Sequence, residues 1–185
     1  MMALSLSFEQ FLNSYCFNFD RFIVRKIFFQ NHKTMATLKN QTRLLNDLIL
    51  INNDRVVGYQ KAMEELKKED ADLKLLFQEK VNQSNKFKAE LTDKVIETGY
   101  EVVTGTTNAG KIYRVWMDVK VFFGGSERKV VLDNCEDGED AALAAYNDAL
   151  TTEGLNPEVR SLISNHLAAL KISHDRIKAL RDAEK

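Results

Sequence analysis

Four polar residues each stand near the middle of an apolar stripe with helical spacing, and these are Asn52, Ser84, Glu139 and His166. A four-helix bundle with a polar layer inside its core has this appearance in sequence. Bundles bind metals or small ligands in such layers, because facing helices supply the ligands from several sides. Glu139 and His166 are therefore the candidate metal ligands, and iron or manganese is the metal that such a site would take.

The ligand set is incomplete for a centre with two metal ions. Such a centre takes a glutamate from each of two helices and a Glu-x-x-His pair from each of the other two. Ile163 stands three residues before His166, where this pattern requires a glutamate. Ser84 is the polar residue on the second helix, and the nearest carboxylate on the first helix, Asp54, lies off the apolar stripe. Glu139 and His166 alone make half of a mononuclear site.

The alternative is a polar cluster without metal, which we favour. Glu139, His166, Asn52 and Tyr146 would then form hydrogen bonds with one another and fix the register of the helices, as single buried polar residues do in coiled coils. Tyr146 lies two turns after Glu139 on one helix face, so it fits either this layer or the apolar core. A buried carboxylate without partners is strongly destabilising, and Glu139 therefore requires a neighbour or access to solvent.

The segment Gly105–Lys111 matches the first seven positions of a phosphate-binding P-loop. Ile112 replaces the Ser or Thr hydroxyl that this motif requires. A P-loop also needs a parallel sheet, whereas most of this chain has helical periodicity. Nucleotide hydrolysis is therefore disfavoured, although the amides of this loop remain candidates for binding an anion.

Gly138 interrupts an acidic run on the predicted third helix. Glycine inside a helix costs about 1 kcal/mol relative to alanine. It either permits close approach of a neighbour or belongs to the entry turn of a helix that begins near Glu139. The flanking Glu136 and Asp140, like His174, are expected to lie on solvated helix faces.

The apolar spacing predicts four long amphipathic helices. The first spans about 38–68, and the second follows a cap at Asp70 and ends at Gly99. The third follows Ser126, and the last starts at Asn156, which precedes a proline at the first helical position. Short connections make the first two helices antiparallel neighbours, and likewise the last two. Residues 100–125, with a short helix predicted over 111–123, fit the long crossover of a ferritin-like all-α bundle.

Residues 1–34 differ in composition from the rest, because seven of the eleven phenylalanines fall there. Polar residues interrupt the segment too often for a secretory signal or a bilayer span. We interpret it as an N-terminal extension, either disordered or upstream of a true start at Met35, so that the bundle comprises residues 35–185. A membrane-surface anchor is the alternative.

The net charge of -1 argues against a nucleic-acid or membrane partner, since phosphate surfaces attract a basic excess. The two cysteines, Cys16 and Cys135, lie in regions of different character, so no disulfide framework is predicted and a cytoplasmic setting is expected. Cys135 lies on a core stripe, where thiols are inert. No catalytic residue is predicted, and no cofactor other than the metal named above.

Three segments resemble a family of bacterial ferritin-like four-helix bundles known as a domain of unknown function. They are 45–49 with Gly58 and Tyr59, then 135–140 with Tyr146 and 149–150, and finally 174–177. The resemblance spans about 35–185 and implies the fold, with no activity to carry over. We expect a binding or structural module without turnover, with a metal-binding redox or iron-handling protein as the alternative. Complete apolar stripes also permit a homodimer.

Overall fold

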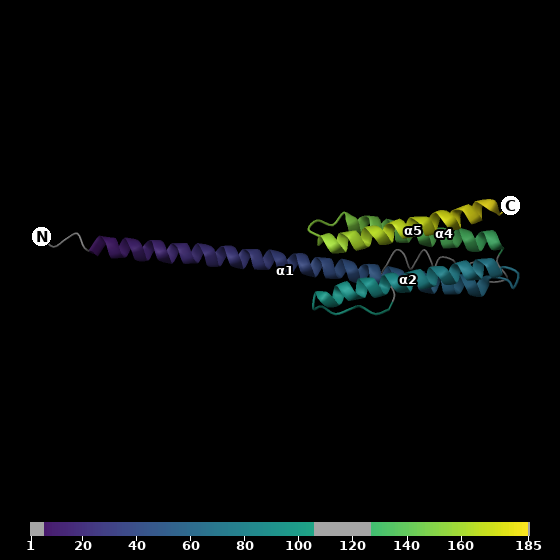
Figure 1. Ribbon diagram of the computed structural model, residues 1–185, viewed down its shortest axis with the longest axis horizontal. Helices are drawn as coiled ribbons and strands as arrows, with labels where there is room; N and C mark the ends of the chain where they lie inside the picture. Colours follow the sequence, from purple (N-terminus) through teal and green to yellow (C-terminus); the bar gives the residue numbers. More distant parts are fainter. Residues whose placement is uncertain (1–5, 106–126, 185) are drawn as a thin grey trace. The chain divides into compact units, whose positions relative to one another are not determined.

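The computed structural model describes residues 6–105 and 127–184, with side-chain surroundings from residue 35 onward. These residues form four helices and no strand: α1 (Leu6–Glu65), α2 (Ala71–Glu97), α4 (Arg128–Leu150) and α5 (Pro157–Ala183) (Figure 1). The all-α prediction is therefore confirmed. The chain divides into two compact units, Met1–Asn40 and Gln41–Lys185, and the second contains the bundle. The domain boundary at residue 35 stays a prediction.

The end of α1 and the start of α2 lie close to the residues expected for them. α1 starts at Leu6, well before the predicted start near residue 38, and ends at Glu65. Asp70 occupies the N-cap of α2, but its side chain makes no capping bond there. Its Oδ2 instead accepts a hydrogen bond from the Lys67 amide at 3.1 Å, which closes the turn between the helices. Gly99 has φ 75°, the left-handed conformation expected for a glycine that ends a helix.

The second pair of helices also follows the sequence signals, and the structure decides between the two alternatives for Gly138. Gly138 lies inside α4 and is buried, so the helix does not begin near Glu139. The residue before α4 is Glu127, while the predicted cap at Ser126 and the short helix over 111–123 lie outside the described residues. Asn156 caps α5, because its Oδ1 accepts a hydrogen bond from the Glu158 amide at 2.8 Å.

The core of the bundle consists of two apolar clusters along its length. One contains Leu45, Phe87 and Ile163, and the other contains Phe77, Leu132 and Ile177. Each such fully buried side chain contributes about 1.5–3 kcal/mol to stability. Between these levels, every helix of the bundle places polar residues in the interior, which positions the candidate site.

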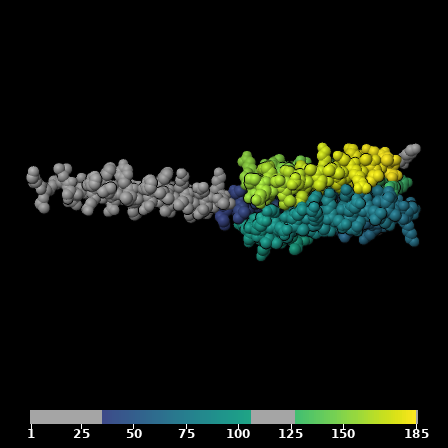
Figure 2. All heavy atoms as spheres, in the orientation of Figure 1, coloured from purple at the N-terminus to yellow at the C-terminus, as the bar shows by residue number. Residues whose placement is uncertain are grey.

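The outer surface shows how α2 and α5 pack together. Figure 2 shows the yellow side chains of α5 lying against the teal side chains of α2. Ion pairs join the two helices near both ends, with Glu79 Oε2 3.2 Å from Arg176 Nη1 and Lys94 Nζ 3.2 Å from Glu158 Oε2. Among the described residues, no helix is both long and apolar enough to cross a membrane.

Candidate functional site

The centre of the bundle contains a buried ion pair between α1 and α4. Arg55 Nη2 lies 2.6 Å from Glu139 Oε1, and both side chains are 0% exposed. The same carboxylate oxygen accepts hydrogen bonds from Ser173 Oγ of α5, at 2.8 Å, and from the Tyr59 hydroxyl. Arg55 Nη1 donates to Ser84 Oγ of α2 at 2.8 Å. All four helices therefore contribute to this set of residues, which we call the arginine layer.

In the arginine layer, burial and neighbouring charges shift the pKa values of Arg55 and Tyr59. Burial is the largest single influence on the pKa of Arg55 and lowers it, but the neighbouring acidic groups, Glu139 first among them, together outweigh burial and raise this pKa above its ordinary value. Burial raises the pKa of Tyr59 well above its usual range, and Glu139 adds to the effect. The Tyr59 hydroxyl therefore stays protonated and donates to Glu139.

A second polar set, which we call the histidine layer, lies at a neighbouring level. Asn52 Nδ2 donates to the Tyr146 hydroxyl at 2.7 Å, and that hydroxyl lies 3.4 Å from His166 Nδ1. His166 Nε2 lies 2.7 Å from Glu90 Oε2, whose side chain is 37% exposed. The Phe87 ring stacks on the imidazole at 3.9 Å between ring centroids. These contacts connect the buried amide of Asn52 to the bundle surface.

Burial lowers the pKa of His166, and the hydrogen bond to Glu90 opposes this effect only in part. Burial also raises the pKa of Tyr146 above its ordinary value. Both groups therefore favour their neutral forms inside the bundle. The histidine layer is consequently a network of neutral hydrogen-bonding groups that ends at one half-exposed carboxylate.

The predicted polar residues are thus distributed over two layers. Asn52, Tyr146 and His166 come together in the histidine layer, whereas Glu139 and Ser84 belong to the arginine layer. Glu139 and His166 make their contacts with different residues, and their role as a shared metal site stays a prediction. The expected cluster of Glu139 with the other three is therefore divided between two levels of the bundle.

Arg55 is the residue that the sequence reasoning missed. It stands three residues after Asn52 and four before Tyr59, so it lies on the apolar stripe of α1. A basic residue at such a position was the available signal, because a buried cation requires a buried partner of opposite charge. Ser173 carried a similar signal, because it stands three residues after Leu170 and four before Ile177 on the apolar stripe of α5, whereas Glu90 carried none.

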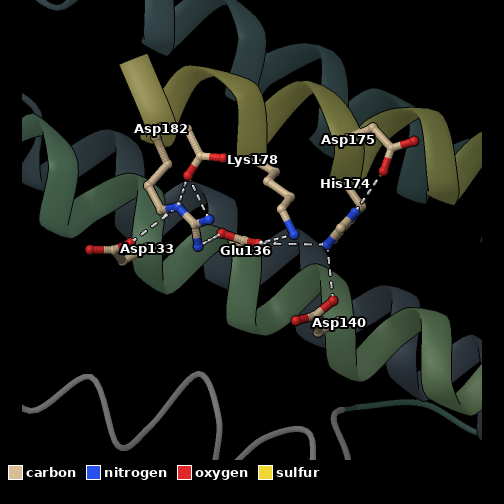
Figure 3. A network of polar contacts seen from close by, with 8 residues as sticks. Asp133, Glu136, Asp140, His174, Asp175, Lys178 and Asp182 are labelled. Atoms are coloured by element: carbon tan, nitrogen blue, oxygen red, sulfur yellow. Dashed lines mark hydrogen bonds and ion pairs between the residues drawn. The ribbon is translucent and has the colours of Figure 1, made fainter. Parts of the chain in front are cut away.

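A separate polar cluster, which shares no residue with these two layers, lies between α4 and α5 (Figure 3). His174 Nε2 lies 3.0 Å from Asp140 Oδ1 and 3.8 Å from Glu136 Oε1. His174 Nδ1 lies 3.0 Å from Asp175 Oδ1. The side chains of Glu136 and His174 are only 6% and 13% exposed, which corrects the expectation that both are solvated, whereas Asp140 is 63% exposed as expected. The charged residues around this group are Asp133, Lys178, Arg181 and Asp182.

Two solved structures have folds similar to that of this chain. A mutant of Dps1 from Mycobacterium smegmatis matches with a TM-score of 0.65 and 12% identity, over 79% of this chain and 97% of that one. A dodecameric thioferritin, the bacterioferritin-related protein from Bacteroides fragilis, matches with a TM-score of 0.59 and 15% identity, over 77% and 84%. These likenesses confirm that the chain forms a ferritin-like four-helix bundle.

Residues 40–152 match the model of a protein family described as a domain of unknown function, DUF2383, and the chain belongs to this family. No curated protein matches the chain. The family resemblance inferred from the sequence is therefore confirmed, and function must be argued from the residues themselves.

Ferritin-like bundles with two iron ions surround them with glutamates and histidines from four helices. The arginine layer contains one carboxylate, and a guanidinium binds one of its oxygens. The other oxygen, Glu139 Oε2, is buried and has no hydrogen-bond partner among the described residues. A metal ion at this carboxylate would lie near the charge of Arg55, and like charges repel strongly in a buried environment. The residues of this layer therefore do not fit a di-iron centre.

Proposed function

We propose that this protein is a binding or structural module built on a ferritin-like bundle, without turnover at the bundle centre. The observation that supports the proposal is the contact between Arg55 Nη2 and Glu139 Oε1 at 2.6 Å, in a layer to which all four helices contribute. The guanidinium of Arg55 balances the negative charge of Glu139, so no external cation is needed to neutralise this carboxylate.

In this proposal, the arginine layer determines the axial register of the four helices relative to one another. Since Arg55 reaches Ser84 on α2 and Glu139 on α4, a shift of one helix along its neighbours would leave a buried charge without its partner. Such a state is disfavoured by several kcal/mol, whereas apolar contacts alone tolerate small shifts. The layer thereby selects one register of the bundle, as a buried polar residue does in coiled coils.

The alternative is a redox or iron-handling protein that binds iron or manganese through Glu139 and His166. It differs from the proposal in a measurable way, because it requires metal to be lost when either residue is replaced. An anion site at Gly105–Lys111 is a remote alternative, and all of that segment except Gly105 lies outside the described residues. A homodimer and a cytoplasmic setting stay predictions, and light scattering of the purified protein tests the first.

The deciding experiment measures iron on the full-length chain. His174→Ala serves as the background, because it removes the histidine of the polar cluster between α4 and α5. It is compared with His174→Ala combined with Glu139→Gln or His166→Gln. Each protein is incubated with ferrous iron in air, desalted and analysed for metal by mass spectrometry. We expect the same low iron content in all three, with a lower thermal midpoint in the Glu139→Gln protein.

The opposite result is equally clear. If the His174→Ala protein binds near-stoichiometric iron and loses it with Glu139→Gln or His166→Gln, the bundle centre is a metal site and the proposed structural role is wrong.

A further inference from the structure

We propose that Glu136, Asp140 and His174 form a binding site for one divalent first-row transition-metal ion, with Asp175 as the residue that positions the imidazole. This inference names a ligand for the binding module proposed above and in that sense rests on it. It uses no residue of the arginine layer or the histidine layer, so the two proposals can fail separately.

The geometry of the three side chains suits one ion. Glu136 and Asp140 stand four residues apart on α4 and therefore project from the same face. His174 reaches them from α5, and one ligand atom of each residue lies within 4.8 Å of the other two. In a tetrahedral site with bonds near 2.1 Å, neighbouring ligand atoms are about 3.4 Å apart. The two distances from His174 Nε2, 3.0 and 3.8 Å, lie on either side of that value.

The hydrogen bonding of His174 favours a cation at its Nε2 atom. A carboxylate can only accept, so the contact between Nδ1 and Asp175 Oδ1 places a proton on Nδ1. Nε2 of the neutral ring then presents a lone pair to the carboxylates of Asp140 and Glu136, which are also acceptors. A lone pair of Nε2 that faces two carboxylate oxygens is unfavourable unless a second proton or a metal ion lies between them. A carboxylate that holds the far nitrogen is also the usual partner of a metal-bound histidine.

The surrounding charge favours a divalent ion over a proton alone. In the network of Figure 3, five carboxylates face two permanent cations, Lys178 and Arg181, so its net charge is -3 with a neutral imidazole. Arg181 contacts Glu136 Oε2, while Lys178 Nζ lies 3.8 Å from Glu136 Oε1. Lys178 therefore competes with a metal ion for Oε1, and a metal at that oxygen would displace a side chain that is 51% exposed.

The ligand types and the exposure define the class of metal. An ion can enter from solvent on the side of Asp140, which is 63% exposed, and water can complete its coordination there. One imidazole and two carboxylates suit zinc, ferrous iron, cobalt or manganese. Calcium and magnesium prefer sites made only of oxygen ligands, and the described cluster contains no sulfur ligand for cuprous copper.

The test uses Zn²⁺ titrated into metal-free full-length protein by calorimetry, with Co²⁺ absorption as a spectroscopic signature of the ligands. We expect one ion per chain, and a loss of at least about tenfold in affinity for His174→Ala and Asp140→Asn. Asp175→Asn should weaken binding about 10- to 100-fold while keeping the Co²⁺ spectrum, because it alters only the orientation of a ligand. Lys178→Gln should strengthen binding, since it removes the competing cation.

Asp137→Asn is the matched control, because Asp137 is an exposed carboxylate on the same helix outside the cluster. It should leave Zn²⁺ affinity unchanged. Equal weakening by Asp137→Asn and Asp140→Asn would show attraction by general charge and overturn the site, as would unchanged Zn²⁺ affinity in His174→Ala. Glu139→Gln should bind Zn²⁺ as the wild type does, which separates this test from that of the bundle centre.

Discussion

Arg55 Nη2 lies 2.6 Å from Glu139 Oε1 in the middle of the bundle, and neither side chain has any exposed surface. The two residues come from helices that are distant in sequence, and the guanidinium also reaches Ser84 on a third helix. A cation supplied by the chain itself thus lies beside the carboxylate that the sequence pattern marked as a metal ligand. The pair makes the bundle centre sensitive to the loss of either partner.

Removing one member of this pair should be much more destabilising than removing both. We expect Arg55→Ala to lower the free energy of unfolding by about 3–5 kcal/mol, because Glu139 is then left as an unpaired buried charge. Arg55→Met combined with Glu139→Leu should recover most of that loss. Urea unfolding followed by circular dichroism measures these values.

The control for this comparison is Arg43→Ala, which removes an exposed arginine from the same helix and should change stability by no more than about 0.5 kcal/mol. A single Arg55→Ala variant as stable as this control would contradict the role of the arginine layer.

The stability of the bundle should fall as pH decreases through the range in which His166 titrates. Burial lowers the pKa of His166 in the folded state below its ordinary value of 6.5. The unfolded chain therefore takes up the proton first, so stability is lost as pH falls from 6.5 toward the lowered pKa. The groups that face the ring are Glu90, Tyr146 and Lys86.

Thermal midpoints of the wild type and His166→Gln measured between about pH 7.5 and pH 5.5 test this expectation. The wild type should lose more stability over the range than the variant does. Parallel curves for the two proteins would show that another group causes the change.

Cys135 should react with alkylating reagents only when the bundle opens. Burial raises the pKa of its thiol well above the ordinary value, and the nearby Glu139 charge adds to this effect. In a Cys16→Ser protein, iodoacetamide should modify Cys135 at least about 100-fold more slowly in buffer than in denaturing urea. Mass spectrometry over time gives both rates, and similar rates in the two solvents would mean that the core around Cys135 is open.

Asn46 should hold the first residues after α2 against α1. Its Nδ2 donates to the Glu101 carbonyl at 3.0 Å, and its Oδ1 accepts from the Val103 amide at 3.1 Å. Asn46→Ala should speed hydrogen exchange at the Val103 amide by about 5- to 10-fold, the effect of losing a bond worth roughly 1 kcal/mol. The Glu158 amide, held by Asn156, serves as the internal reference. Unchanged exchange at Val103 would contradict this contact.

The helices of the bundle could be predicted from the sequence because their signals are local. Apolar side chains three and four residues apart mark one face of a helix, and the caps are decided within a few residues. The start of α2 after Asp70 and of α5 after Asn156 were therefore predicted to the residue. The N-cap of α4 is Glu127, one residue after the predicted cap at Ser126, which lies outside the described residues.

The candidate site could be predicted only in part. Polar residues on apolar stripes, such as Asn52, Glu139 and His166, were identified as buried, and all three are. The hydrogen-bond partners of these residues could not be identified from the sequence, because a hydrogen bond between two helices depends on the rotation and axial position of both helices. Glu136 was expected to be solvated for the same reason, since its burial comes from the packing of α5 against α4.

The sequence by itself determined an all-α bundle of amphipathic helices and the positions where polar side chains enter its core. Only the tertiary structure decided that Arg55 neutralises Glu139 and that Glu136, Asp140 and His174 converge on one point. The physical reason is that helical periodicity arises from neighbours in the chain, whereas charges and ligands pair across space. Their pairing follows from how whole helices pack, and that depends on every residue at their interfaces.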